Sequence, residues 1–279
     1  MAAPQGPTAV HVGNATAVYW PGHAALATAL AEAADRAGRW PGLPDSIRPS
    51  VRILVAASQR QFDSLVAGRL PAWGAGAAFP TLNTVVVQAG RDPFRVLRHE
   101  LAHVALHTVL PRPPLWLDEG YAARAAGEWS RLAAVRLNWA VALGQVPTLR
   151  GLTVSLRGDA AGAEVGYALA ASAVMLLERL GGERGLGPLL DALRRDGDLD
   201  QALRQVHQMS LDQFEQRWRR DLRRRFGWLA LVGSFAGLWA MVLAVVGALW
   251  WRRRRRDAVR RAALEIGWPA PVDEPGASA

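Results

Sequence analysis

The sequence predicts an α+β fold: a small N-terminal β-sheet with helices, then a mainly helical part, and one C-terminal transmembrane helix. Three observations predict it. Segments typical of strands occur before residue 91, helix-forming segments follow from residue 92, and residues 226–251 carry no charged side chain. We therefore expect four parts, namely residues 1–91, 92–225, 226–251 and 252–279.

The N-terminal part contains three segments with the residue types of strands. β-branched residues favour strands over residues 10–20, 51–56 and 83–88. Residues 24–37 are rich in helix formers and are followed by a glycine, which predicts a helix between the first two strands. The first part is therefore expected to be a sheet with helices packed on it.

Two capping signals place the next helices. Ser58 can cap a short helix that ends near Ala67, and the Gly/Pro-rich residues 68–80 then predict a loop. Asp92, followed by a proline at the first helical position, predicts a helix over residues 92–109.

The second part consists of further helices. Helical segments are expected over residues 117–143 and 164–180, the latter ending at two glycines. Ser210 and Gln213 have the spacing of a capping box and predict the start of another helix.

Residues 226–251 are expected to cross a membrane. As a helix they would extend about 39 Å, against ~30 Å of bilayer hydrocarbon, and tryptophans stand near both ends. Gly233 and Gly237 form a G-x-x-x-G pair, through which a homodimer is possible. The sequence thus predicts a single-pass membrane protein whose Arg-rich tail, residues 252–279, is disordered.

The predicted orientation follows from the arginines on both sides of this segment. Five consecutive arginines directly after residue 251 favour a cytoplasmic tail and an extracytoplasmic N-terminal domain. Six arginines precede the segment and seven follow it, so the opposite orientation stays open under the same rule. That orientation requires an export leader, and residues 1–12 have neither the basic start nor the apolar run of one.

Composition excludes several kinds of chemistry. The chain has no cysteine and no lysine, which rules out thiolate catalysis, Cys-ligated metals, Schiff bases and P-loop lysines. The formal net charge is +9, but the arginines gather beside the apolar segment. We interpret them as facing lipid headgroups, and we expect no nucleic-acid partner.

The sequence His99-Glu100-Leu101-Ala102-His103 has the H-E-x-x-H pattern on a predicted helix. Two histidines at i and i+4 share one helix face, so both imidazoles can reach a single metal ion. The neighbouring Glu100 is placed to act as a general base. The pentapeptide therefore predicts a catalytic metal site.

A catalytic zinc site needs a third protein ligand. His107 lies ~12 Å further along the helix axis than His99, too far to share the metal, and is expected to pack or to support the site. Leu106 and Val109 stand where a metzincin has glycine and histidine, which excludes that family. The segment WLDEG at residues 116–120 instead offers a carboxylate beyond a proline-rich turn.

HELAH followed by WLDEG resembles the gluzincin metallopeptidases, in particular the membrane-attached bacterial peptidase MA-like proteins. The resemblance is close over residues 97–123 and looser further on. It implies that Zn²⁺ is held by His99, His103 and Glu119, with Glu100 as the base.

The resemblance also implies a tyrosine that stabilises the oxyanion, for which Tyr167 is preferred and Tyr121 is second. It further implies an edge strand at residues 83–88 that binds extended peptide, with Asn83 and Thr84 facing the cleft. No G-x-M-E-N segment is present, so aminopeptidase activity is not implied. Asp118 has two possible roles: it supports a ligand histidine or caps its own helix.

The function predicted from the sequence is hydrolysis of peptide or protein substrates by a membrane-anchored zinc peptidase. One alternative is a catalytically silent gluzincin-like binding or assembly module at the membrane, and a second is a soluble zinc hydrolase that acts on a non-peptide amide.

Overall fold

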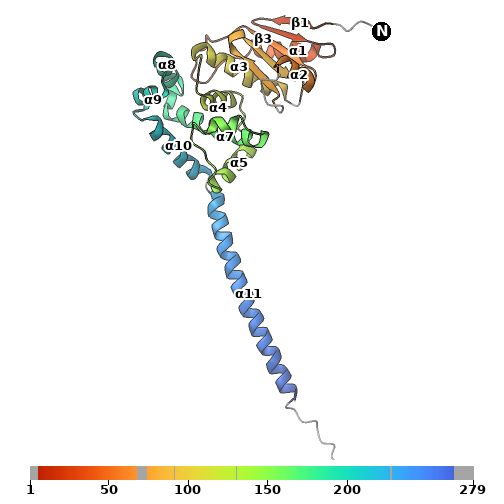
Figure 1. Cartoon of the computed structure of the whole chain (residues 1–279), viewed down its shortest axis with the longest axis vertical. Helices are drawn as coiled ribbons and strands as arrows, with labels where there is room; N and C mark the ends of the chain where they lie inside the picture. Colours follow the sequence, from red (N-terminus) through yellow and green to blue (C-terminus); the bar gives the residue numbers. More distant parts are fainter. Residues whose placement is uncertain (1–5, 68–73, 91, 130, 227, 267–279) are drawn as a thin grey trace, which may run out of the picture. The chain divides into compact units, whose positions relative to one another are not determined.

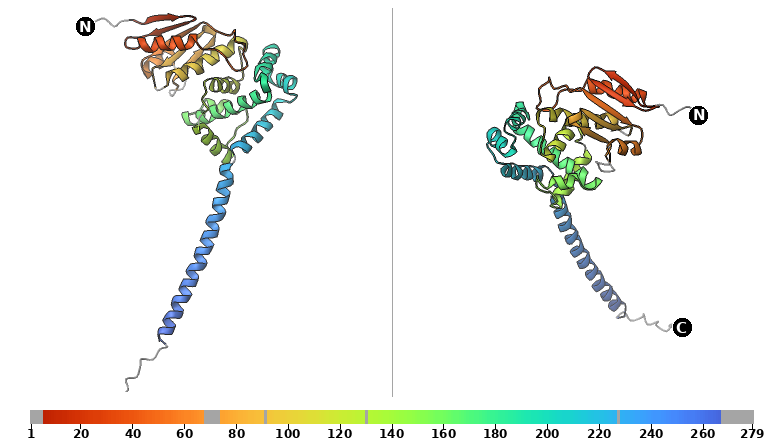
Figure 2. Two further views of the ribbon diagram at one scale, coloured as in Figure 1. Left: turned by 180° about the vertical axis from the view of Figure 1, so that it is seen from behind. Right: turned by 45° about the horizontal axis from the view of Figure 1, so that its top comes forward.

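The computed structural model describes residues 6–67, 74–90, 92–129, 131–226 and 228–266. It consists of two compact units, Met1–Trp228 and Leu229–Ala279, of which the first contains the sheet and the packed helices (Figure 1). The two views in Figure 2 follow the first unit from the sheet, in red to yellow, to the helical part in green and teal.

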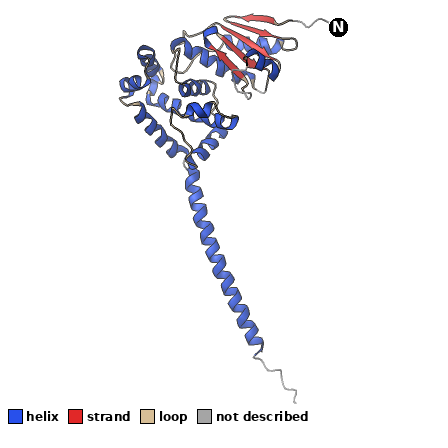
Figure 3. Cartoon of the chain, viewed as in Figure 1, coloured by secondary structure: helices blue, strands red, loops and turns tan. Residues whose placement is uncertain are grey.

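The sheet has five strands in the order β1-β2-β3-β5-β4. β1 and β2 form an antiparallel hairpin, β3 and β5 continue the sheet in parallel, and β4 runs antiparallel to β5 at the edge (Figure 3). The strands are β1 (Thr8–Val12), β2 (Ala15–Tyr19), β3 (Val51–Ala56), β4 (Gly76–Phe79) and β5 (Thr84–Gln88).

Alternation of side chains along the strands gives the sheet two apolar faces. Val85 and Val87 of β5 belong to the main core with α1 and α3, whereas Val86 between them packs on the opposite face with Phe62 of α2. The helices of this part are α1 (Ala24–Asp35), α2 (Gln59–Leu65), the 3₁₀ turn η1 (Pro80–Leu82) and α3 (Pro93–Val109). Both faces of the sheet are therefore covered, as β-branched strands without alternating polar residues require.

Two expectations for this part are wrong. Residues 10–20 are not one strand, because Gly13 adopts φ +50° and begins the turn between β1 and β2. Residues 76–79, expected in a loop, form β4; glycine and alanine carry no strand signal, so only pairing with β5 reveals this strand. Residues 68–73 of the expected loop lie outside the described residues.

The capping predictions are confirmed. Ser58 accepts a hydrogen bond from the amide of Gln61, and Asp92 accepts one from the amide of Arg95. Ser210 and Gln213 form the reciprocal pair of a capping box, with distances of 2.8 and 3.2 Å.

In the helical part, the other helices pack around one long helix, α7 (Ala160–Leu180). The expected helix over residues 117–143 is interrupted, because Gly127 adopts φ +68° and separates α4 from α5. The helices are α4 (Leu115–Ala125), α5 (Arg131–Ala142), α6 (Leu152–Leu156), α7 (Ala160–Leu180), the 3₁₀ turn η2 (Gly182–Arg184), α8 (Gly187–Asp196), α9 (Leu199–His207) and α10 (Leu211–Phe226).

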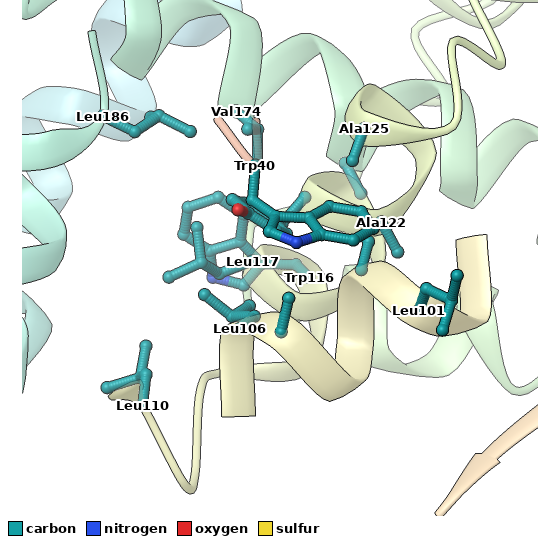
Figure 4. Close-up of a cluster of buried hydrophobic side chains, with 14 of the residues drawn as sticks. Trp40, Leu101, Leu106, Leu110, Trp116, Leu117, Ala122, Ala125, Val174 and Leu186 are labelled. Atoms are coloured by element: carbon teal, nitrogen blue, oxygen red, sulfur yellow. The ribbon is translucent and has the colours of Figure 1, made fainter. Parts of the chain in front are cut away.

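One continuous core joins the sheet to the helical part. Figure 4 shows Trp40 lying over Leu117 and Trp116 of α4, with Leu101 and Leu106 of α3 close by, and all five side chains are buried. Burial of large apolar side chains of this kind contributes about 1.5–3 kcal/mol each. The core fixes α4 beside α3, which is the relationship on which the site depends.

Helix α7 contacts α4 and α10 closely. A Cβ atom at Gly120 would lie 2.5 Å from the Ala170 carbonyl oxygen, so α4 and α7 approach at a point where only glycine fits. The buried indole of Trp218 donates a 2.8 Å hydrogen bond to the Ser172 hydroxyl and ties α10 to α7.

The expected transmembrane helix is wrong. Within the described residues no helix has a span long and apolar enough to cross a membrane, so the predicted single-pass membrane localisation is overturned as well. The long C-terminal helix is α11 (Trp228–Ile266).

The end of the chain also differs from expectation. Residues 252–266, expected to be disordered, continue α11, where Arg255 stacks on Trp251 with 3.8 Å between the guanidinium carbon and the ring centroid. Residues 267–279 lie outside the described residues. The side chains around Gly233 are also not described, so a homodimer through Gly233 and Gly237 stays a prediction.

Candidate active site

Helices α3 and α4 bring the predicted metal ligands together. His99 and His103 lie one turn apart on α3, and their imidazole rings are 5.0 Å apart between centroids. Three prolines between the helices end α3 and turn the chain back, and buried Trp116 and Leu117 anchor α4 against the core. Glu119 of α4 therefore faces the two histidines.

The three candidate ligand atoms lie within 4.8 Å of one another, close enough to hold one metal ion. Glu119 Oε2 lies 3.5 Å from His99 Nε2 and 3.6 Å from His103 Nε2. Ligands bound tetrahedrally at ~2.0–2.1 Å would be about 3.4 Å apart, so little rearrangement is needed to hold Zn²⁺. Two imidazoles and one carboxylate are also a donor set that zinc accepts.

Glu100 shares a pocket of about 270 Å³ with these ligands. Its side chain is 8% exposed and lies against Gly76 of the edge strand. Gly76, Ala77 and Ala78 of β4 form one wall of the pocket. A carboxylate next to the ligand set, in a pocket that the sheet edge borders, is the arrangement that general-base chemistry needs.

Each predicted ligand histidine has a second carboxylate behind it. His103 Nδ1 donates to Asp118 Oδ1 at 2.6 Å, and His99 Nδ1 donates to Glu128 Oε1 at 3.1 Å. These contacts fix the ring orientation that leaves both Nε2 atoms toward Glu119. His107 Nε2 donates to the other oxygen of Asp118 at 2.9 Å, so His107 supports the site from behind.

The two possible roles of Asp118 are thereby distinguished. Pro114, not Asp118, occupies the N-cap of α4, and the Asp118 side chain contacts His103 and His107. His103, His107 and Asp118 form a second group that could hold a metal ion, and these hydrogen bonds hold the group together.

The charged side chains of the site shift one another's pKa values. Burial alone would lower the pKa of His99, but the carboxylates of Glu119 and Glu128 outweigh burial and raise this pKa from 6.5 to about 10. Burial would likewise lower the pKa of His103, and Asp118 and Glu119 raise it well above its ordinary value. Burial raises the pKa of Glu100.

The two candidate tyrosines lie in different surroundings. Tyr167 of α7 lines the pocket, with its ring 6.1 Å from the His99 ring, edge to face. Tyr121 is fully buried, outside the residues that line this pocket, and its hydroxyl has no hydrogen-bond partner within the described structure. The geometry thus favours Tyr167 as the residue that can reach a substrate.

The strand expected at the edge of the sheet is not an edge strand. Thr84 begins β5, which is paired on both sides by β3 and β4, and Asn83 is exposed outside the pocket lining. The edge strand at the pocket is β4. The reason is that residues 76–79 add a strand that the composition of this segment does not indicate.

Two further residues of the site escaped the sequence reasoning. Glu128 lies beyond the end of α4, and nothing in its local sequence marks it as a partner of His99. Gly76 lies in a Gly/Ala-rich segment, and its contact with Glu100 depends on the pairing of β4 with β5.

Comparison with known proteins matches most of the chain to a protein family. The family model described as the Peptidase MA superfamily matches residues 44–224, which is more than half of the chain and includes every residue of the candidate site. A comparison with curated proteins finds no significant match.

Proposed function

The chain belongs to the Peptidase MA superfamily, and from this premise we propose that it is a zinc-dependent peptidase of the gluzincin type. In this proposal His99, His103 and Glu119 hold the metal, Glu100 is the general base and Tyr167 assists the reaction. The observation that carries it is the convergence of three ligand atoms on a pocket that also contains Glu100, with Glu119 about one tetrahedral edge from each histidine.

When bound, Zn²⁺ would act as a Lewis acid that makes water more acidic and polarises the substrate carbonyl. The residues of the chain supply the remaining functions. Glu100 accepts a proton from the attacking water and delivers it to the leaving amine nitrogen. Its burial raises its pKa, which makes its carboxylate a stronger base for the first of these two transfers.

Tyr167 is proposed to donate a hydrogen bond to the oxyanion that forms on the carbonyl oxygen. Burial raises the pKa of its hydroxyl, and the carboxylates of Glu119 and Glu100 raise it further. The hydroxyl therefore keeps its proton at neutral pH and acts as a donor. Tyr121 has no such access to the pocket.

The substrate is proposed to be an extended peptide that adds to the free edge of β4. The backbone of Gly76–Ala78 borders the pocket, and its small side chains let another chain approach closely. Backbone hydrogen bonds of this kind tolerate many sequences. Specificity would then depend on the side chains that line the rest of the pocket.

Metal analysis of the purified full-length chain tests the proposal. We expect about one zinc ion per chain, retained in a Glu183→Ala control that alters an exposed glutamate and lost in Glu119→Ala. The zinc-loaded chain should cleave members of a diverse peptide library. Zinc binding without any cleavage would instead support the catalytically silent module, and equal zinc content in the Glu119→Ala variant would refute the ligand assignment.

A further inference from the structure

A second cavity, of about 500 Å³, lies between α7 and α10 and shares no residue with the lining of the peptidase pocket. Its apolar part consists of Leu176, which is buried, and Leu180, which is half-buried. Its charged part consists of four arginines and one aspartate, namely Arg179, Arg217, Arg220, Arg224 and Asp221. We call it the arginine cavity.

Asp221 pairs with only one of the four arginines of the cavity. Its Oδ2 accepts a hydrogen bond from Arg179 at 2.7 Å, and its Oδ1 accepts one from Arg225 at 3.0 Å. Arg225 does not line the cavity. Within the described residues no carboxylate lies at ion-pair distance from Arg217, Arg220 or Arg224. The lining residues therefore carry a clear excess of positive charge.

The arginines without a carboxylate come from one face of α10. Positions 217, 220 and 224 follow the i, i+3 and i+7 spacing that places side chains in a row on a helix. The opposite side of α10 is tied to the core through Trp218, which donates to Ser172 of α7. The row is thus held at a fixed place on a packed helix.

The pKa of His207, which lies outside the cavity, is affected by one of these arginines. Burial lowers the pKa of its imidazole, and Arg217 lowers it further because a second positive charge is disfavoured beside the guanidinium. The charge of Arg217 is therefore close enough to act on a side chain of the neighbouring helix α9.

We propose that the arginine cavity binds a small phosphate monoester that carries an apolar group. Guanidinium forks match phosphate oxygens in two-point hydrogen bonds, and a dianion answers the excess charge better than a carboxylate does. The two leucines would cover the apolar group. This site is independent of the proposed peptidase function, since no residue of the metal site takes part in it.

Phenyl phosphate is a suitable probe, titrated into the full-length chain by isothermal calorimetry. We expect saturable binding to one site, weaker binding of benzoate and of inorganic phosphate, and no binding of phenol. The variant Arg217→Gln/Arg220→Gln/Arg224→Gln should bind phenyl phosphate at least about tenfold more weakly, because charged hydrogen bonds contribute about 1.5–3 kcal/mol each.

The matched control is Arg150→Gln/Arg157→Gln/Arg194→Gln, which removes the same charge from exposed arginines outside the cavity. It should keep the wild-type affinity. Equal weakening in both triple variants would show general charge attraction, and saturable binding that needs no cavity arginine would place the ligand elsewhere; either result overturns the proposal. Circular dichroism checks that each variant is folded. If phenyl phosphate does not bind to the wild-type chain, the proposed site is also refuted.

Discussion

Gly76 of β4 lies directly against Glu100 of α3: a Cβ atom at position 76 would be 2.4 Å from Glu100 Oε1 and 2.5 Å from a methyl carbon of Val96. The edge of the sheet therefore sets the position of the proposed base. Any residue type other than glycine at position 76 would displace the Glu100 side chain.

Gly76→Ala should impair turnover and leave the metal in place. The added methyl group must displace the Glu100 carboxylate, and a shift of about 1 Å in a reacting group can cost roughly 100-fold in rate. Peptide hydrolysis and zinc content are measured side by side. Gly90→Ala, where a Cβ would meet its nearest neighbour at an ordinary 3.9 Å, is the control. Normal turnover in Gly76→Ala would contradict the role given to Glu100.

Asp118→Asn and Glu128→Gln should each weaken zinc binding by about 10–100-fold. Each change removes the charged acceptor that orients one ligand histidine, at 2.6 Å for His103 and 3.1 Å for His99. Asp118 holds His107 as well, so its replacement should have the larger effect. Competition with a zinc chelator measures the affinities. Unchanged affinity in both variants would mean that the rings are oriented by packing alone.

Zinc binding should release protons at neutral pH. In the metal-free chain the pKa of His99 is about 10 and that of His103 is also raised, so both rings are protonated at pH 7. Zinc binds the neutral ring, and apparent affinity should therefore rise with pH, by about tenfold per pH unit for each proton displaced. Calorimetry in buffers of different ionisation enthalpy counts the protons. Release of none at pH 7 would contradict the charge state described for the site.

Gly120→Ala should destabilise the fold and loosen the site together. Its Cβ would lie 2.5 Å from a backbone carbonyl of α7, which cannot turn aside as a side chain can. Overpacking of this kind costs about 1–3 kcal/mol, and the adjacent Glu119 would move with α4. Urea unfolding and zinc affinity are the measurements. Gly38→Ala, with nothing within 4 Å of the added atom, should show neither effect.

Most helices were predictable because their ends carry local signals. Asp92, Ser58 and the Ser210 and Gln213 pair mark helix starts through hydrogen bonds between near neighbours. The family was predictable for a similar reason, since the HELAH and WLDEG segments are short and distinctive. The family match supports this resemblance at the level of the superfamily.

Features that depend on distant partners were not predictable. β4 consists of glycine, alanine and phenylalanine and becomes a strand only through β5, which moved the edge of the sheet away from the expected strand. Glu128 reaches His99 across 29 positions of sequence. The membrane span was expected from the uncharged run at residues 226–251 alone, and no helix within the described residues is long and apolar enough to be one.

The central claim, that Glu100 acts as the base beside a metal held by His99, His103 and Glu119, is tested most directly by Glu100→Gln. The amide keeps the shape of the side chain but cannot accept a proton from water. Zinc content and peptide hydrolysis are measured on the same preparation of wild type and variant. The account predicts equal zinc content with hydrolysis reduced by at least about 100-fold; near-normal hydrolysis by the zinc-loaded variant would contradict it.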